Sequence, residues 1–233
     1  AVDFAQLLEM AAVSFPKMRI RFSTSNPQDM HEEVLHIIAK YPNICEHIHL
    51  PVQSGSDRVL KLMNRLHTRA EYMALIDNIR RIIPNVEITQ DMIAGFPTET
   101  EEDHLDTLSL MEYVKYNFGY MYAYSERPGT LAGRRMEDDV PEATKLRRLQ
   151  EIVDLQRKHS GERTKSYIGK TVEVLIEKVS KKSPDDLSGR NPQSLMVVFP
   201  KENYKVGEFV DVKITNCTSG TLIGEAVGYS QMN

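Results

Sequence analysis

The periodicity of the chain changes well past its midpoint, and this change constrains the fold more than any other feature of the sequence. Up to about residue 125, short apolar segments alternate with amphipathic ones, which is the pattern of β–α units. After about residue 168, only short segments of alternating apolar and polar residues follow, separated by Gly189, Gly207 and Gly220. The sequence therefore predicts an α/β part followed by a small all-β part.

The first part is predicted to hold four strands and five helices. The strands cover 18–22, 47–50, 86–93 and 120–124, and the helices cover 2–14, 28–40, 56–65, 69–83 and 100–116. Thr98 and Glu101 have the spacing of a capping box before the last of these helices. Four strands do not close a barrel of the usual eight. We therefore expect an incomplete barrel from which earlier units have been removed.

A long helix and a second set of strands complete the prediction. The helix covers 143–165, with Leu146, Leu149 and Val153 on one face, and the clearest strands are 171–180, 195–199, 209–214 and 222–227. Four or five short strands favour a small barrel of the OB-like kind, because closure hides the edges of the sheet. The predicted domains are an α/β domain over 1–142, a basic linker helix over 143–167 and a β-barrel over 168–233.

Charge is distributed unevenly along the chain, whose net charge is −4. Residues 1–144 carry 14 Lys and Arg against 22 Asp and Glu, whereas residues 145–165 carry seven basic and three acidic residues. Taken alone, such a basic helix is best explained as a solvated face.

The remaining composition narrows the compartment and the chemistry. No apolar run approaches the length of a membrane span, and the first residues lack the basic start of a signal peptide, so we expect a cytoplasmic protein. Cys45 and Cys217 provide neither a disulfide framework nor metal-ligand spacing, so no metal site is predicted.

Polar residues follow each predicted strand of the first part. Parallel α/β units bind ligands at the carboxyl ends of their strands. Any one of these residues is explained equally well as a helix or turn cap, but four consecutive polar loops on one rim favour a ligand site. The residues are Ser23, Ser25, Gln53, Ser54, Asp91, Ser125 and Arg127.

Several longer motifs resemble a known family. The stretches IHLPVQSGSDRVLKLMNRLHTRAEY (48–72), IAGFPTETEEDHLDT (93–107) and YSERPGTLA (124–132) resemble the second half of the radical-SAM domain in the methylthiotransferases. The segment 174–199 is similar to the TRAM domain that ends those enzymes. The resemblance implies a partial radical-SAM β/α barrel, containing only the later strands, followed by an OB-like TRAM barrel.

Within this family, 19–27 and LPVQSGSD are most similar to the MiaB-type branch. That branch adds a methylthio group to isopentenyl-adenosine beside the tRNA anticodon. The branch that modifies a ribosomal protein ranks second. A non-catalytic RNA-binding protein and a small-molecule α/β enzyme using acid–base chemistry remain as alternatives, although no paired carboxylates or nucleophile–base set supports the last.

The resemblance also implies cofactors. The full-length enzyme would use S-adenosylmethionine and [4Fe–4S] clusters, but the family's three-cysteine loop is absent from this chain. We therefore expect this chain to be inactive alone, to contribute no catalytic residue, to bind no cluster and to bind S-adenosylmethionine weakly at most. The residues implied in cofactor binding are Ser23, Gln53, Ser54, Asp91, Ile93 and Gly95.

The implied partner is tRNA, whereas the sulfur donor is not indicated by the sequence. Lys and Arg supply the phosphate contacts of RNA-binding proteins, and the basic helix over 145–165 is expected to add to them. Arg127 is equally well explained as a salt bridge to an acidic helix. The candidates for RNA binding are Lys178, Lys181, Lys182, Arg190, Asn191 and Arg127.

Overall fold

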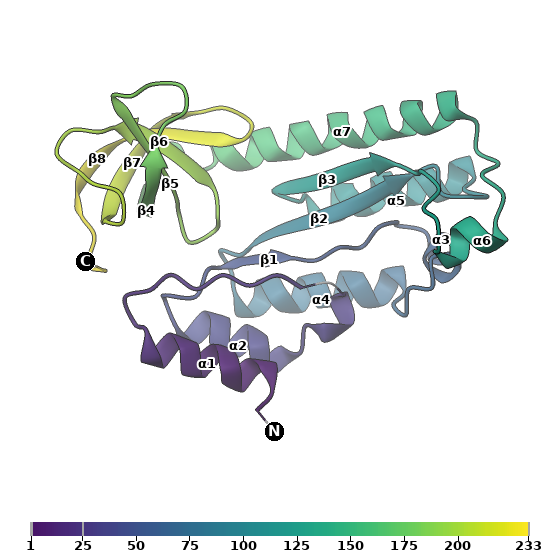
Figure 1. Cartoon of the computed structure of the whole chain (residues 1–233), viewed down its shortest axis with the longest axis horizontal. Coiled ribbons are helices and arrows are strands. Elements are labelled where there is room, and N and C mark those ends of the chain that lie inside the picture. The colour runs from purple at the N-terminus through teal and green to yellow at the C-terminus, as the bar shows by residue number, and fades with distance from the viewer. Residues whose placement is uncertain (1, 25, 233) are drawn as a thin grey trace.

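The computed structural model describes residues 2–24 and 26–232, and it divides into a three-stranded sheet with its helices and a closed five-stranded barrel (Figure 1). The sheet consists of β1 (His47–His49), β2 (Glu87–Ala94) and β3 (Phe118–Ala123), in that order. The helices are α1 (Phe4–Ser14), the 3₁₀ helix η1 (Pro27–Asp29), α2 (Glu32–Lys40), α3 (Asp57–Leu62), α4 (Arg69–Ile82), α5 (Glu101–Val114), α6 (Leu131–Arg135) and α7 (Glu142–Lys165).

The three strands pair in parallel, as the alternation of strands and helices predicts. Apolar residues of the sheet and helices form one core, which includes Ile48, Ile76, Ile88 and Met111. The opposite face of the sheet carries polar and aromatic side chains that line two cavities. This open face therefore holds the candidate functional residues.

The structure corrects three local predictions in this part. The segment 18–22 forms only a single bridge, between Ile20 and Ile44, and the arginines on either side of Ile20 pair with Glu173 and Glu177 of the barrel. The capping box before α5 uses Thr100 and Asp103 instead of Thr98 and Glu101. Thr98 has a left-handed backbone (φ 66°), which is not the extended conformation of an N-cap. The short helix α6, capped by Thr130, was not predicted.

Helix α7 is longer than a connector requires and packs along β2, β3 and α5 (Figure 1). Its buried face contains Lys145, Arg148, Ile152 and Gln156. Of the predicted apolar face, Leu149 packs against the core, whereas the Leu146 side chain is exposed. The Gln156 amide donates to the carbonyl oxygen of Tyr116 at 2.8 Å. By its contacts, α7 belongs with the sheet.

The second part is a barrel of β4 (Thr171–Val179), β5 (Asp186–Arg190), β6 (Met196–Pro200), β7 (Phe209–Cys217) and β8 (Thr221–Tyr229). The order β4-β5-β6-β8-β7 closes through a parallel pairing of β6 with β8, which confirms the OB-like barrel. Strand β5 was missing from the clearest predicted strands. Gly189 in β5 permits the close packing, because a Cβ atom there would overlap the Leu175 carbonyl.

The barrel is held against the first part by buried polar contacts. Arg19 pairs with Glu173 at 2.5 Å, donates to the Arg190 carbonyl at 2.6 Å and lies over the Phe209 ring. The Arg19 side chain is only 4% exposed. A second contact joins Glu87 of β2 to the Tyr167 hydroxyl at 3.0 Å. Because these contacts are largely buried, the two parts are expected to keep a fixed orientation.

Candidate functional site

A cavity of about 520 Å³ lies at the carboxyl ends of the sheet strands. We call it the strand-end cavity. Its size is within the range of small-molecule sites. Its walls include Gln53, Asp91, Ile93, Tyr122 and Arg127. The cavity is therefore located where parallel α/β units bind ligands.

Backbone pairing brings Gln53 and Asp91 together. The Gln53 amide donates to the Asp91 carbonyl at 2.9 Å, and the Ile93 amide donates to the Gln53 carbonyl at 3.0 Å. Gln53 has a left-handed backbone (φ 74°), which a residue with a side chain rarely adopts. At Gln53 the backbone therefore turns away from the direction of β1, beside the cavity.

Three other candidates lie elsewhere. Ser54 is fully buried, with its hydroxyl 3.4 Å from that of Thr107 on α5. Gly95 (φ 73°) accommodates Lys145, because a Cβ atom there would overlap the Lys145 side chain. Ser23 lines a second cavity, and Ser25 is outside the described residues. The structure thus brings Gln53, Asp91 and Ile93 together, but not Ser23 or Ser54.

Asp91 has the most informative environment in the strand-end cavity. Its Oδ2 atom lies 3.5 Å from Nε2 of His49, whereas its Oδ1 atom is buried and has no hydrogen-bond partner among the described residues. Arg65 lines the same cavity and attracts the carboxylate electrostatically. A buried polar atom without a partner is unfavourable unless a ligand or water satisfies it. Asp91 therefore fits a ligand that carries a hydrogen-bond donor or a positive charge.

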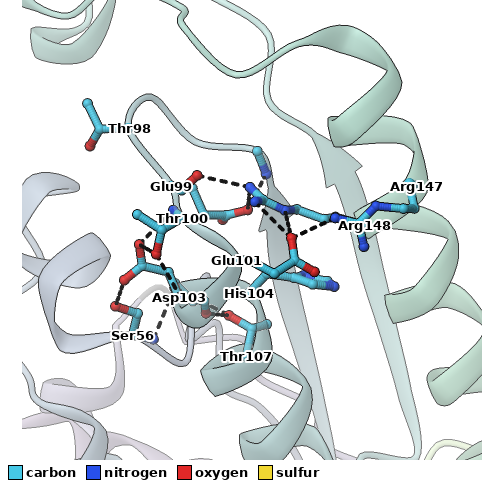
Figure 2. Close-up of polar contacts among 12 residues, drawn as sticks. Ser56, Thr98, Glu99, Thr100, Glu101, Asp103, His104, Thr107, Arg147 and Arg148 are labelled. Carbon is cyan, nitrogen blue, oxygen red and sulfur yellow. Dashed lines mark hydrogen bonds and ion pairs between the residues drawn. The ribbon is translucent and has the colours of Figure 1, made fainter.

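Side chains of α7 contact the loop that follows β2 (Figure 2). Glu99 accepts from the Gly95 amide at 2.9 Å and from Arg148 at 3.0 Å, and both charged side chains are at most 5% exposed. Burial raises the pKa of Glu99, whereas Gly95 and Arg148 favour its charged form. Lys145 donates to Asp138 at 2.5 Å and lies near the Tyr124 ring. The start of α7 therefore fixes the loops that form one side of the strand-end cavity.

Asp103 fixes the start of α5 in the same region (Figure 2). It accepts from the Ser56 hydroxyl at 2.6 Å and from the Thr100 amide at 2.8 Å, and it pairs with Arg58. Burial opposes ionisation, but the hydrogen bonds from Arg58, Ser56 and Thr100 hold the pKa of Asp103 well below its usual range. The loops after β1 and β2 are thereby joined through one carboxylate.

Sequence reasoning missed Lys145 and Arg148 as supports of the site. A signal was present, because positions 145, 148, 152 and 156 recur at helical spacing and include the apolar Ile152. Long basic side chains can occupy a buried stripe when carboxylates pair with them.

The RNA-binding candidates separate into two groups. Lys178, Lys181 and Lys182 are exposed at the end of β4 and in the loop after it. In contrast, Asn191 is fully buried and its side chain accepts from the Leu195 amide at 2.8 Å. Arg190 pairs with Glu177 at 2.6 Å at the base of the barrel. The three lysines thus differ from Arg190 and Asn191, whose side chains are engaged in contacts within the protein.

A second cavity, of about 650 Å³, lies between the sheet and the barrel. We call it the junction cavity. Its lining includes Ser23, Arg21, His47, Tyr120 and Arg190. Burial, followed by the nearby His49, Arg21 and Arg190, lowers the pKa of His47 to about 4. His47 is therefore held largely uncharged in the junction cavity, beside two arginines that both pair with Glu177.

The cysteines do not fit an iron–sulfur cluster. Cys45 is 2% exposed, and Cys217 lies at the end of β7 in the barrel. Within residues 2–24 and 26–232, no three His, Cys, Asp or Glu side chains are placed to hold a metal ion. No chemistry is therefore assigned to a cluster held by this chain.

Comparisons with known proteins agree with this architecture. Residues 1–111 match the Radical SAM superfamily, and residues 165–227 match the TRAM domain. The tRNA-2-methylthio-N(6)-dimethylallyladenosine synthases of Flavobacterium johnsoniae and Christiangramia forsetii are 78% and 67% identical over the whole chain. The chain is thus similar over its whole length to these synthases, and its two parts match the radical-SAM and TRAM family models in that order. It covers 48% of each relative, so it spans about half the length of the curated relatives it matches.

A solved structure supports the fold. Coproporphyrinogen III oxidase of Escherichia coli, described as a radical-SAM enzyme, aligns with 75% of this chain and 46% of its own length, with a TM-score of 0.52 and 17% identity.

In the part of the chain that the structure describes, none of the helices is both long and apolar enough to span a membrane.

Proposed function

We propose that this chain is part of a methylthiotransferase that adds a methylthio group to isopentenyl-adenosine next to the tRNA anticodon. The observation that carries the proposal is the 78% identity, over all 233 residues, to a synthase whose name states that reaction. The motifs that form the strand-end cavity lie inside this match. A tRNA substrate implies a cytoplasmic enzyme.

The strand-end cavity is proposed as part of the S-adenosylmethionine site. That ligand carries a sulfonium, an ammonium and ribose hydroxyls, which complement the carboxylate of Asp91 and the side-chain amide of Gln53. Ile93, Phe96 and Tyr122 provide apolar wall for the adenine. When bound in the full-length enzyme, S-adenosylmethionine would supply radical and methyl-transfer chemistry, with the electron coming from a cluster that the described residues of this chain do not hold. The residues of this chain bind and orient it.

The barrel is proposed to contact tRNA through Lys178, Lys181 and Lys182. These lysines are exposed, and none of them forms an ion pair with another described residue. Free ammonium groups contribute phosphate contacts whose strength falls with salt. Arg127 lies at the strand-end cavity, where it is placed for a phosphate or a carboxylate of the ligand.

Two measurements test the proposal. In the full-length enzyme, mass spectrometry of digested tRNA should show the methylthio nucleoside, and Asp91→Asn and Gln53→Ala should lower its yield. In the 233-residue chain, titration calorimetry should detect weak S-adenosylmethionine binding that Asp91→Asn weakens further, whereas Asp185→Asn in the barrel leaves it unchanged. Full activity of Asp91→Asn would contradict the assignment of the cavity.

A further inference from the structure

Four polar side chains form a continuous row on the open face of the sheet, from the junction cavity to the strand-end cavity. They are His47 and His49 of β1 and Thr89 and Asp91 of β2. Alternate residues of neighbouring strands project to the same face, and the register places His49 beside Thr89. His47, His49 and Thr89 line the junction cavity, whereas Asp91 lines the strand-end cavity.

Both histidines of this row contact the same hydroxyl group, that of Thr89. Thr89 Oγ1 lies 3.0 Å from Nε2 of His47 and 3.0 Å from Nδ1 of His49. The other nitrogen of His49, Nε2, lies 3.5 Å from Oδ2 of Asp91. Each member therefore contacts the next, and the row ends at the unpartnered Oδ1 atom.

Proton counting selects one arrangement of these groups. A hydroxyl has a single proton, and a neutral imidazole has one N–H. If both histidines donated to Thr89, His49 would present a nitrogen lone pair to the Asp91 carboxylate, which is repulsive. The favourable arrangement has His47 donating to Thr89, Thr89 donating to Nδ1 of His49, and Nε2–H of His49 facing Asp91. If His49 gains a proton, Thr89 can rotate toward His47, and Nε2–H still faces Asp91.

We infer that Asp91 and Thr89 together fix the tautomer of His49, with Nε2–H facing Asp91 and Nδ1 accepting from Thr89, and that His49 thereby orients the Asp91 carboxylate at the edge of the strand-end cavity. A ligand group that meets this carboxylate must then be a hydrogen-bond donor, such as an ammonium or a hydroxyl. His49 and Thr89 are positioning residues, since they act through Asp91. The part of the inference that concerns S-adenosylmethionine rests on the function proposed above.

The surrounding charges are compatible with this arrangement. Burial is the main cause of the lowered pKa of His47, and His49, Arg21 and Arg190 add to it, so His47 is uncharged at neutral pH. An uncharged His47 can exchange hydrogen bonds with Thr89 in either direction. Arg65 attracts the carboxylate from the strand-end cavity.

The tautomer can be measured without a ligand. In the 233-residue chain labelled with ¹⁵N-histidine, long-range ¹⁵N–¹H correlation should show His49 with its proton on Nε2 at neutral pH, with His49→Gln used to assign the signal among the seven histidines. Thr89→Val keeps the side-chain volume but removes the hydroxyl from which Nδ1 of His49 accepts, so the ¹⁵N signal of Nδ1 should shift toward that of a nitrogen without a hydrogen bond. Thr89→Ser should restore the native signal. A native Nδ1–H tautomer, or a signal unchanged in Thr89→Val, would overturn the inference.

Ligand binding supplies the second measurement. Thr89→Val should weaken S-adenosylmethionine binding about tenfold, as expected for one disturbed hydrogen bond to a charged group, whereas Thr89→Ser binds as the native chain does. Thr215→Val in the barrel is the matched control. Unchanged affinity in a Thr89→Val chain with an altered His49 signal would overturn the positioning role. If the native chain binds no S-adenosylmethionine, the assignment of the strand-end cavity to that ligand fails, and the tautomer measurement alone decides the hydrogen-bond arrangement.

Discussion

Two basic regions of this chain have similar sequence signatures but opposite structural roles. In 145–165, six of the seven basic residues pair with a carboxylate. Five of these pairs join α7 to a residue outside the helix, and the sixth, Arg157 with Asp154, lies within it. The lysines at 178, 181 and 182 remain exposed and unpaired among the described residues. Local charge therefore does not measure the charge available to RNA. The acidic excess of 1–144 is partly used to neutralise α7.

The largest effect that separates these regions should be on stability. Arg148→Met leaves Glu99 buried without its partner, which should lower the free energy of unfolding by about 3–5 kcal/mol. Arg157→Ala, which removes an exposed pair with Asp154, should change it by less than about 0.5 kcal/mol. Urea unfolding measures both. If Arg148→Met were as stable as Arg157→Ala, the supporting role of α7 would be wrong.

In the pairing of its charges, the junction cavity is intermediate between α7 and the three lysines, because Arg21 and Arg190 share the single carboxylate of Glu177. The lowered pKa of His47 means that the unfolded chain takes up a proton below about pH 6.5, whereas the folded chain does so only near pH 4. Stability should therefore fall as pH decreases through this window, by up to about 3 kcal/mol from this group. His47→Gln should remove that part of the loss in urea unfolding at pH 4.5 and 7. An identical pH dependence in both proteins would contradict it.

Binding of tRNA at several salt concentrations compares the two regions directly. Changing Lys178, Lys181 and Lys182 together to Ala should flatten the slope of log affinity against log salt by up to about 3 units, since each phosphate contact contributes roughly 0.9. A matched triple change in α7, of Arg147, Arg157 and Lys158 to Ala, should alter the slope much less. Equal effects of the two variants would show that paired charges bind RNA as well as free ones.

The smallest effect should come from single changes at the barrel. Lys182→Ala should flatten the salt slope by about one unit if its ammonium reaches a phosphate. Arg190→Ala should flatten it by less, because Glu177 neutralises this guanidinium at 2.6 Å. The comparison is contradicted if Arg190→Ala has the larger effect.

The sequence predicted the alternation of strands and helices, the closed barrel and the rim that holds Gln53 and Asp91. These predictions succeed because periodicity and strand ends depend on local spacing. Ser54 faces away from the cavity although it follows Gln53, since neighbouring residues project in different directions at a bend. The segment 18–22 was misread for a different reason. Its arginines are used by the barrel, a contact between residues more than 150 positions apart.

The charge prediction for α7 shows the same limit. A sequence lists seven basic residues in 145–165, but their partners Glu87, Glu99 and Glu101 come from segments that only folding brings near. In the same way, Asn191 reads as a polar surface residue, yet it closes a buried turn before β6. Pairing at long range is set by tertiary structure, and neither composition nor local spacing reports it.

The continuity of α7 also limits how this protein can vary. The helix runs 24 residues, from the loops of the strand-end cavity to the barrel. Inserting one residue between Leu149 and Gln156 would turn everything beyond it by about 100° and move it about 1.5 Å along the axis. Arg163 would then miss Glu87, and His159 would miss Glu112. Surface loops generally tolerate insertions, but we expect this helix to keep a constant number of residues, because its contacts at both ends depend on its length and on its rotation about its axis.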